Sequence, residues 1–327
     1  MPSLRLSVLD VYAPAVREVI SRSAPETFAL RFAESYDEHE QRGLAEEADF
    51  LLAGWAQIDA AMIAAAKRLR MVQKWGIGVD RIDVEALRRA GIPLAITAGA
   101  NAGPVAEHAI MLMLSVLRRL PVVDRALREG RWLKSEMRAT ALQLSGKTVG
   151  LVGFGNIGRT VALKLAGFDC RILYYDPRPL DRATERAFRV RQASLDQLFA
   201  ESDVVSLHLP ATAETMGLVD GARLQAMKKG AVLINTARGE LVDEAALHRA
   251  LTEGPLSGAG LDAFAQEPPE AGNPLLSLDN VVVTPHVGGA AFDNVENTAR
   301  HALGNLLAFV EGRPLSPLDI VVPPLPR

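Results

Sequence analysis

The sequence predicts an α/β protein built from two doubly wound parallel-sheet domains. Three observations lead to this prediction. Short apolar runs alternate with helix-like segments in two successive series, a glycine-rich turn opens the second series, and 327 residues exceed the length of one average domain. A composition of 49% hydrophobic and 23% charged residues is typical of a globular protein, so no fibrous or disordered class competes.

The first series predicts the first domain. Its expected strands are the apolar runs at residues 4–9, 50–53, 71–74 and 93–97. No glycine pattern of the phosphate-binding kind occurs among them. The last part of the chain is expected to return to this domain, since a helix at 294–311 is followed by a proline-rich tail with the apolar run Ile320–Val322.

The second series predicts a larger sheet. Six strands, enough for a full doubly wound sheet, are expected at residues 148–152, 171–175, 203–207, 231–235, 258–261 and 281–284. Between the two series, residues 105–120 predict a helix that stops before Pro121 and crosses between the domains. A charged segment, 122–144, follows it.

The turn after residues 148–152 has the pattern Gly153-Phe154-Gly155-Asn156-Ile157-Gly158. A buried strand precedes it, and apolar residues at helical spacing follow it. Gly153 suits the tight turn, Gly155 lets the backbone approach a pyrophosphate, and Gly158 lets helix and strand pack closely. The setting favours a dinucleotide-binding Rossmann domain over a merely glycine-rich turn, with the phosphates at the helix N-terminus.

Asp176 ends the next expected strand, 18 residues after Gly158. A carboxylate at this spacing binds the ribose hydroxyls of the adenosine and repels the 2′-phosphate of NADP. NAD is therefore the predicted cofactor. Arg178 and Arg182 follow closely, and because either could accommodate a 2′-phosphate, NADP stays open.

Three residues that follow expected strands of the second series have complementary chemistry. Ligands of open α/β sheets bind beyond the carboxyl ends of the strands, and Arg238, Glu267 and His286 follow three of those ends. His286 would take or return the proton of a substrate hydroxyl, and Glu267 would orient the imidazole and stabilise its charged form. Arg238 would bind a carboxylate and polarise a carbonyl.

Each of the three also has a purely structural interpretation. A strand-end histidine is often a satisfied structural residue, an arginine is often an ion-pair partner, and Glu267 precedes two prolines that suit a solvated loop. Their combination on one domain favours catalysis. His208, at another strand end, is kept as a competing base.

The remaining composition excludes several classes. A net charge of −3 provides no broad basic field for nucleic acid, and no apolar run approaches the ~20 residues that span a bilayer. The N-terminal residues lack the pattern of a signal peptide, so a cytoplasmic location is expected. The single cysteine, Cys170, allows neither an internal disulfide nor a cysteine metal cluster, and no metal site is predicted.

The chain resembles the D-isomer-specific 2-hydroxyacid dehydrogenases over about residues 40–312. The motifs that carry the resemblance are Gly76-Ile77-Gly78-Val79-Asp80, Gly99-Ala100-Asn101, Val105-Ala106-Glu107-His108, the turn Gly153 to Gly158, Leu207-His208-Leu209-Pro210, Asn235-Thr236-Ala237-Arg238-Gly239, Gly260-Leu261-Asp262 and Pro285-His286. Together they are highly specific.

The resemblance implies the roles of individual residues. The catalytic trio falls on Arg238, Glu267 and His286, the same three that the residues themselves indicate. The expected cofactor contacts are Gly153, Phe154, Gly155, Asn156, Ile157, Gly158, Asp176, His208, Leu209, Pro210, Thr215, Thr236, Ala237, Asp262, His286 and Gly288. The expected substrate contacts are Lys74, Gly76, Ile77, Gly78, Asn101 and Arg238, with backbone amides around Ile77 and Gly78 on the substrate carboxylate.

The resemblance also implies the architecture. A flavodoxin-like substrate domain, residues 1–101 plus 296–327, is expected to be hinged on an NAD-binding Rossmann domain, residues 102–295, that closes over substrate. A homodimer is expected through residues 105–144.

The implied function is hydride transfer between NAD(H) and C2 of a small D-2-hydroxyacid or 2-ketoacid. Hydroxypyruvate, glyoxylate, phosphohydroxypyruvate and sugar acids are all open. Lys74 stands where phosphoglycerate enzymes often have a basic residue, but Trp75 is bulkier than the small residue expected beside it. Ile77 stands where phosphite dehydrogenases have lysine, and Glu267 fits the hydroxyacid branch rather than the formate dehydrogenases. The alternative function is an NADH-sensing, non-catalytic corepressor-like scaffold.

Overall fold

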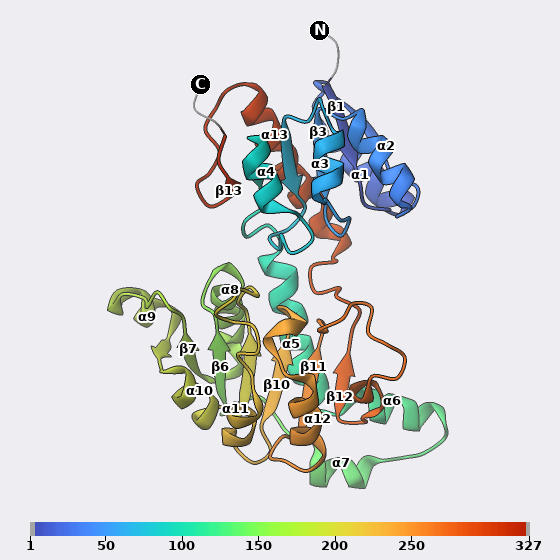
Figure 1. Cartoon of the computed structure of the whole chain (residues 1–327). Helices are drawn as coiled ribbons and strands as arrows, with labels where there is room; N and C mark the ends of the chain where they lie inside the picture. Colours follow the sequence, from blue (N-terminus) through green and yellow to red (C-terminus); the bar gives the residue numbers. More distant parts are fainter. Residues whose placement is uncertain (1–3, 325–327) are drawn as a thin grey trace. The chain divides into compact units, whose positions relative to one another are not determined.

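The computed structural model describes residues 4–324 and contains two compact units (Figure 1). Unit 1 comprises the residues up to Asn101 together with those from Ala291 onward, and unit 2 comprises Ala102–Ala290. Which unit binds substrate and which binds cofactor stays a prediction of the sequence. Within residues 4–324, no helix is both long and apolar enough to cross a membrane.

Unit 1 is a six-stranded sheet in the order β13-β5-β4-β3-β1-β2. Its strands are β1 (Leu4–Val8), β2 (Phe28–Phe32), β3 (Phe50–Ala53), β4 (Met71–Lys74), β5 (Leu94–Ala95) and β13 (Ile320–Val322). Its helices are α1 (Pro14–Ser23), α2 (Glu38–Glu46), α3 (Ala60–Ala65), α4 (Val84–Ala90) and α13 (Val295–Val310), with the 3-10 turn η4 (Phe292–Asn294). β1 to β5 pair in parallel, and β13 pairs antiparallel to β5, so the apolar run near the C-terminus does return to this unit.

Both faces of the unit 1 sheet are buried, as a parallel sheet requires. One cluster joins the sheet to α2, α3 and α4, with Leu51 and Val72 among its strand residues. The other cluster joins it to α1 and α13, with Phe50 and Leu303 fully or almost fully buried. The carboxyl ends of β1, β3 and β4 therefore lie at one edge of a rigid sheet.

Unit 2 is an entirely parallel seven-stranded sheet in the order β12-β11-β10-β9-β6-β7-β8. Its strands are β6 (Thr148–Val152), β7 (Arg171–Tyr175), β8 (Val190–Gln192), β9 (Val204–Leu207), β10 (Val232–Asn235), β11 (Gly258–Leu261) and β12 (Val281–Val283). Its helices are α5 (Ala102–Leu117), α6 (Leu120–Arg128), α7 (Lys134–Thr140), α8 (Asn156–Leu165), α9 (Arg182–Phe188), α10 (Leu195–Glu201), α11 (Gly221–Ala226) and α12 (Glu244–Thr252), with 3-10 turns η1 (Ala166–Phe168), η2 (Gly239–Leu241) and η3 (Pro274–Ser277).

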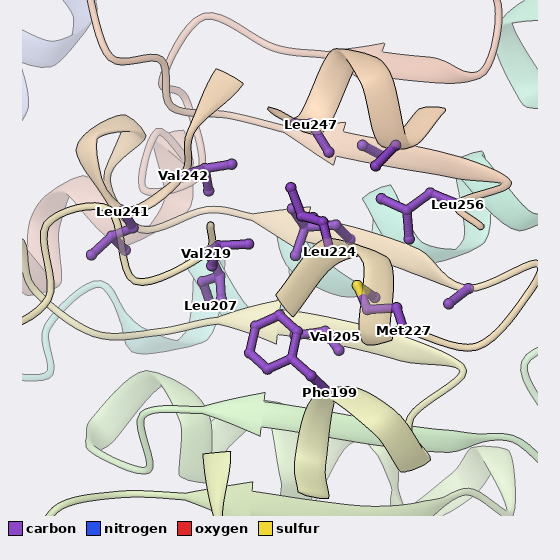
Figure 2. Packing of buried hydrophobic residues seen from close by; sticks show 14 of the residues in the cluster. Phe199, Val205, Leu207, Val219, Leu224, Met227, Leu241, Val242, Leu247 and Leu256 are labelled. Atoms are coloured by element: carbon purple, nitrogen blue, oxygen red, sulfur yellow. The ribbon is translucent and has the colours of Figure 1, made fainter. Parts of the chain in front are cut away.

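Two helical layers cover this sheet. Figure 2 shows one of them, in which Phe199, Leu224 and Leu247 from α10, α11 and α12 pack on the buried strand residues Val205 and Leu207. On the opposite face α5 and α8 pack on the same strands. The strand order reverses between β6 and β9, which is the point where open α/β sheets bind their ligands.

The approach of α5 to β11 depends on two glycines. A Cβ on Gly258 would lie 2.6 Å from Val116 Cγ1, and a Cβ on Gly260 would lie 2.9 Å from Leu112 Cβ. Such distances are shorter than van der Waals contact, so only glycine lets the helix lie this close to the strand.

The structure differs from the predicted elements at three places. β2 and β8 are strands that the sequence analysis did not find; β8 is only three residues long, and Arg191 and Gln192 are exposed. The predicted helix 105–120 begins at Ala102 and ends at Leu117, because Arg119 adopts a left-handed backbone conformation. Pro121 lies in the first turn of α6, where its missing N–H is tolerated. α5 belongs wholly to unit 2.

Candidate active site

The predicted cofactor and catalytic residues of unit 2 follow the carboxyl ends of its strands. The glycine turn follows β6, Asp176 follows β7, His208 follows β9, Thr236 follows β10, Asp262 follows β11 and Thr284 follows β12. Because the sheet is entirely parallel, all these ends lie at one edge.

The glycine turn is too crowded for side chains at two of its three glycines. Gly153 has φ +95°, and a Cβ there would lie 2.4 Å from the carbonyl oxygen of His208. A Cβ on Gly158 would lie 2.2 Å from the carbonyl oxygen of Gly153. No atom of the described part of the chain lies within 4 Å of the corresponding position on Gly155. The backbone thus packs tightly behind the turn and leaves open space at the residue assigned to the pyrophosphate.

The start of α8 fits a phosphate group. Gly155 is the N-cap of this helix and provides no side-chain hydrogen bond to the first turn. The N–H groups of that turn therefore need an external acceptor, and the positive end of the helix dipole favours an anion. Asp176 closes the turn from β7, since its Oδ2 accepts from Phe154 N at 2.9 Å and its Oδ1 from Arg178 N at 2.9 Å. These residues fit a dinucleotide.

Two buried polar atoms near this edge have no hydrogen-bond partner among residues 4–324. They are Nε2 of His208 and Oγ1 of Thr236. Burial lowers the pKa of His208 to about 3, so its ring is neutral at physiological pH. A group with so low a pKa is poorly matched to acid–base work near neutrality, which argues against His208 as the competing base. Both atoms suit polar groups of a bound cofactor.

The segment that follows His208 is an ordered turn. Thr215 Oγ1 donates to the carbonyl of Pro210 at 2.7 Å and accepts from Thr212 N at 2.7 Å. Leu209 is half-buried against the unit 2 core. These hydrogen bonds fix the turn that contains Pro210 and Thr215, and packing on the core holds Leu209 beside it.

His286 and Glu267 form a direct pair. Nδ1 of His286 lies 2.9 Å from each carboxylate oxygen of Glu267, and Glu267 Oε1 also accepts from Phe264 N at 3.0 Å. Burial alone would raise the pKa of Glu267, but the hydrogen bond and charge of His286, the Phe264 N–H and the charge of Arg238 together lower it. Glu267 is therefore ionised at neutral pH and can hold the imidazole in one orientation.

Arg238 lies three residues beyond Asn235, the last residue of β10, and its backbone is fixed by the Asn235 side chain. Asn235 Nδ2 donates to the Arg238 carbonyl at 2.8 Å, and Asn235 Oδ1 accepts from Ala237 N at 3.0 Å. Arg238 Nη1 donates to the Ala237 carbonyl at 2.7 Å. Its positive charge helps to lower the pKa of Glu267, so all three members of the predicted trio interact electrostatically within unit 2.

A second network surrounds Asp262, which is 2% exposed. Its carboxylate accepts from Thr284 Oγ1 at 2.6 Å and from Val287 N and Gly288 N at 2.9 and 2.8 Å. His108 Nε2 lies 2.9 Å from Thr284 Oγ1. Burial alone would raise the pKa of Asp262, but the hydrogen bonds from His108, Thr284 and the two amides lower it. Neither Thr284 nor His108 was given a role from the sequence, although His108 belongs to the motif Val105–His108 that carries the resemblance.

The five predicted substrate residues of unit 1 differ in burial. Gly76 has φ +103° and donates its N–H to Thr97 Oγ1 at 2.8 Å. Lys74 is buried and donates its Nζ to the Gly54 carbonyl, whereas Ile77 is 40% exposed. Asn101 Oδ1 is buried and has no hydrogen-bond partner among the residues that the structure describes. Gly78 is half-buried.

The comparison with protein families identifies this arrangement. The model of the NAD-binding domain of D-isomer-specific 2-hydroxyacid dehydrogenases matches residues 110–288. The chain belongs to this family. The predicted family, the two-sheet α/β fold and NAD as cofactor are thereby confirmed, while the roles of the individual site residues stay predictions.

Known dehydrogenases of the family resemble the chain over most of its length. It is 40% identical to the glyoxylate reductase of Korarchaeum cryptofilum over 257 residues, which are 78% of this chain and 77% of that enzyme. It is 38% identical to the D-3-phosphoglycerate dehydrogenase of Archaeoglobus fulgidus over 259 residues, or 79% of this chain and 49% of that enzyme. The chain thus spans about half the length of the phosphoglycerate relative.

A solved structure resembles the chain over almost all of its length. The NAD-dependent formate dehydrogenase of Staphylococcus aureus, in complex with NAD, superposes with a TM-score of 0.85. It is 27% identical and covers 98% of this chain and 100% of its own.

Proposed function

We propose that the protein is an NAD-dependent D-2-hydroxyacid dehydrogenase that interconverts a small 2-ketoacid and its D-2-hydroxyacid. The observation that carries the proposal is the His286–Glu267 pair, in which both carboxylate oxygens lie 2.9 Å from Nδ1. The positive charge of Arg238 acts on the Glu267 carboxylate as well. A histidine oriented by an ionised carboxylate is the usual arrangement for proton transfer to or from a substrate oxygen. The sensor alternative does not need this pair.

The proton is proposed to move at Nε2 of His286, because Nδ1 is committed to Glu267. In reduction, Nε2 gives its proton to the C2 carbonyl oxygen, which becomes the hydroxyl as C2 gains the hydride. In oxidation, Nε2 takes that proton back. When bound, NAD supplies the acceptor or donor of the hydride. Glu267 stabilises the imidazolium that carries the proton between turnovers.

Arg238 is proposed to bind the substrate carboxylate and to polarise the C2 carbonyl. Its guanidinium keeps its charge at any working pH and offers paired N–H donors that match a carboxylate. Within unit 1, the substrate contacts are proposed to be Lys74, Gly76, Ile77, Gly78 and Asn101. The backbone N–H groups around Ile77 and Gly78 are proposed to hold the carboxylate, because Gly78 adds no side-chain bulk beside it.

Aromatic side chains at the carboxyl edge of unit 1 favour a short substrate. Tyr12 and Trp75 pack with their ring centroids 5.8 Å apart, and the guanidinium of Arg81 lies 3.6 Å from the ring centroid of Trp55. The backbone N–H of Trp55 donates to Asp10 Oδ1 at 2.5 Å, which fixes the backbone position from which the indole extends. Because β3 and β4 are neighbours, the segments that carry Trp55 and residues 76–78 leave the same edge of the sheet, and we propose that the rings limit the room for a long substrate chain.

The test is NADH and NADPH oxidation by the purified protein with a panel of 2-ketoacids. Glyoxylate and hydroxypyruvate are expected to turn over fastest, and NADH is expected to be preferred because Asp176 repels a 2′-phosphate. Phosphohydroxypyruvate, pyruvate, phenylpyruvate and 2-keto sugar acids complete the panel. Binding of NADH without turnover of any member would reject the dehydrogenase and support the sensor.

The substitution Trp55→Ala is expected to change substrate preference. Removing the indole opens space beside residues 76–78, so the kcat/KM ratio of phenylpyruvate to glyoxylate should rise roughly tenfold or more. Steady-state kinetics with both substrates measures the ratio. Phe292→Ala, which removes a ring that is 62% exposed elsewhere in unit 1, is the matched control and should leave the ratio unchanged. A ratio in Trp55→Ala equal to that of the wild type would remove Trp55 from the substrate site.

A homodimer through residues 105–144 is part of the proposal. An open apolar groove of about 570 Å³ lies on unit 2 and is lined by Ile110, Met111, Leu114, Leu120 and Phe168. Met111 is 44% and Leu120 is 53% exposed, and exposed apolar patches of this kind mark interaction surfaces. Light scattering should give the mass of two chains for the wild type and of one chain for Met111→Glu. A monomeric wild type would refute the interface.

The cytoplasmic location stays a prediction.

A further inference from the structure

His108 of helix α5 lies at the carboxyl end of β11. It reaches that position because the residue spacing of the helix matches the residue spacing of the strand. Four residues of helix rise about 6 Å and two residues of strand rise about 6.6 Å, so residues spaced by four can face residues spaced by two. The facing pairs are Val116 with Gly258, Leu112 with Gly260, and His108 with Asp262. The glycines bring the helix onto the strand, and His108 Nε2 ends 3.4 Å from Asp262 Oδ1.

Asp262 fixes the backbone on both sides of His286. On one side it accepts from the hydroxyl of Thr284 at 2.6 Å, and on the other from Val287 N and Gly288 N at 2.9 and 2.8 Å. A Cβ on Gly288 would lie 2.9 Å from Asp262 Oδ2, so the segment is held close to the carboxylate. The buried carboxylate of Asp262 thus fixes the path of the segment that contains His286, the proposed acid–base residue.

The hydrogen-bond direction assigns a task to His108. The Thr284 hydroxyl has one proton and donates it to Asp262, so its oxygen is left to accept from His108 Nε2 at 2.9 Å. His108 must then carry a proton on Nε2. A side chain without a donor at this position would leave Thr284 free to turn its proton away from Asp262.

The segment needs such support because His286 has φ +53°. The left-handed region is unfavourable for a non-glycine residue, and such a conformation persists only where the surroundings hold it. We propose that His108 is a positioning residue for the reaction, which acts through Thr284 and Asp262 to keep His286 in the conformation that pairs it with Glu267. This inference rests on the proposed function and adds a residue outside its catalytic trio.

The experiment compares His108→Leu, which removes the donor, with His108→Gln, which keeps an N–H donor. In His108→Leu, kcat for the best 2-ketoacid should fall about 10- to 100-fold, because small displacements of a reacting group are costly. The dissociation constant of NADH should change by a smaller factor than kcat, since Asp262 and Gly288 are only two of the expected cofactor contacts, and urea unfolding checks that the variant is folded. His108→Gln should recover most of the rate. His248→Leu, on α12 of the same unit, is the matched control and should keep the wild-type kcat.

A double-mutant cycle with Thr284→Val tests the route. If His108 acts through Thr284, the double variant should lose no more than the more impaired single variant, whereas independent roles would multiply the two losses. A wild-type kcat in His108→Leu, a His108→Gln as slow as His108→Leu, or multiplied losses would each overturn the proposal. Should His108→Leu not fold, His108→Asn replaces it, because its amide is too short to reach Thr284.

A readout without turnover separates this proposal from the proposed function. The imidazole ¹⁵N resonances of His286 report its pairing with Glu267 in the enzyme whether or not a substrate is known. They should shift in His108→Leu and stay unchanged in His248→Leu. Absence of turnover in the wild type would reject only the proposed function, whereas unchanged His286 resonances in His108→Leu would reject the positioning role.

Discussion

Replacement of His286 by alanine is expected to lower kcat about 10³-fold or more while the protein still binds NADH. The imidazole is the proposed proton donor in reduction, and Glu267 cannot take its place because its pKa is lowered and it is ionised at neutral pH. Removal of a positioned general acid typically costs 10²- to 10⁴-fold, and water entering the vacated space is a much weaker acid here. Steady-state kinetics with the best 2-ketoacid measures kcat, and fluorescence titration measures the binding of NADH.

Two further variants make this prediction specific. His248→Ala removes a histidine from α12 of the same unit and is expected to leave kcat unchanged. Glu267→Gln keeps the size of the side chain and one possible hydrogen bond to His286 but removes the charge that stabilises the imidazolium, so an intermediate loss is expected. If His286→Ala retained kcat within tenfold of the wild type, the acid would have to be another group.

The three residues of the proposed trio could be placed at one sheet edge from the sequence because the evidence for their positions is local; their catalytic roles stay a prediction. Arg238 and His286 each follow a short apolar run, and parallel strands bring their carboxyl ends to one edge of a sheet whatever the lengths of the connections. The glycine turn was predictable for the same reason, since the strand before it and the helix after it are contiguous with Gly153 and Gly158. Both kinds of inference use residues that are neighbours of a recognisable element.

The support around His286 could not be predicted in this way. His108 lies 154 residues before Asp262, and the two meet only because Gly258 and Gly260 admit α5 to the surface of β11. One sequence shows the spacing of four on the helix and of two on the strand, but not that these two elements face each other. The left-handed backbone of His286 was equally hidden, because no residue type announces it there. β8 was missed since two of its three residues are exposed and polar.

The substitution Gly239→Ala is expected to disrupt the site by displacing the backbone segments on which its residues stand. A Cβ on Gly239 would lie 1.8 Å from the carbonyl carbon of Phe264 and 2.2 Å from Ala265 N. These are backbone atoms, so no side-chain rotation relieves the overlap and one of the two segments must move. Gly239 adjoins Arg238, and residues 264–265 lead into Glu267, whose carboxylate accepts from Phe264 N. A shift of either segment therefore changes the distance between the proposed carboxylate-binding residue and the partner of His286.

Gly239→Ala should lower the free energy of unfolding by about 3 kcal/mol, at the upper end of overpacking effects because the contact is with backbone. It should also lower kcat by about 100-fold in the fraction that remains folded. Urea unfolding followed by tryptophan fluorescence and steady-state kinetics measure the two effects. Gly167→Ala in the same unit, where nothing lies within 4 Å of the added carbon, should change stability by no more than about 0.5 kcal/mol. A Gly239→Ala protein as stable and active as the wild type would show that the segment carrying Glu267 does not pack on Gly239, and the trio would lose its structural basis.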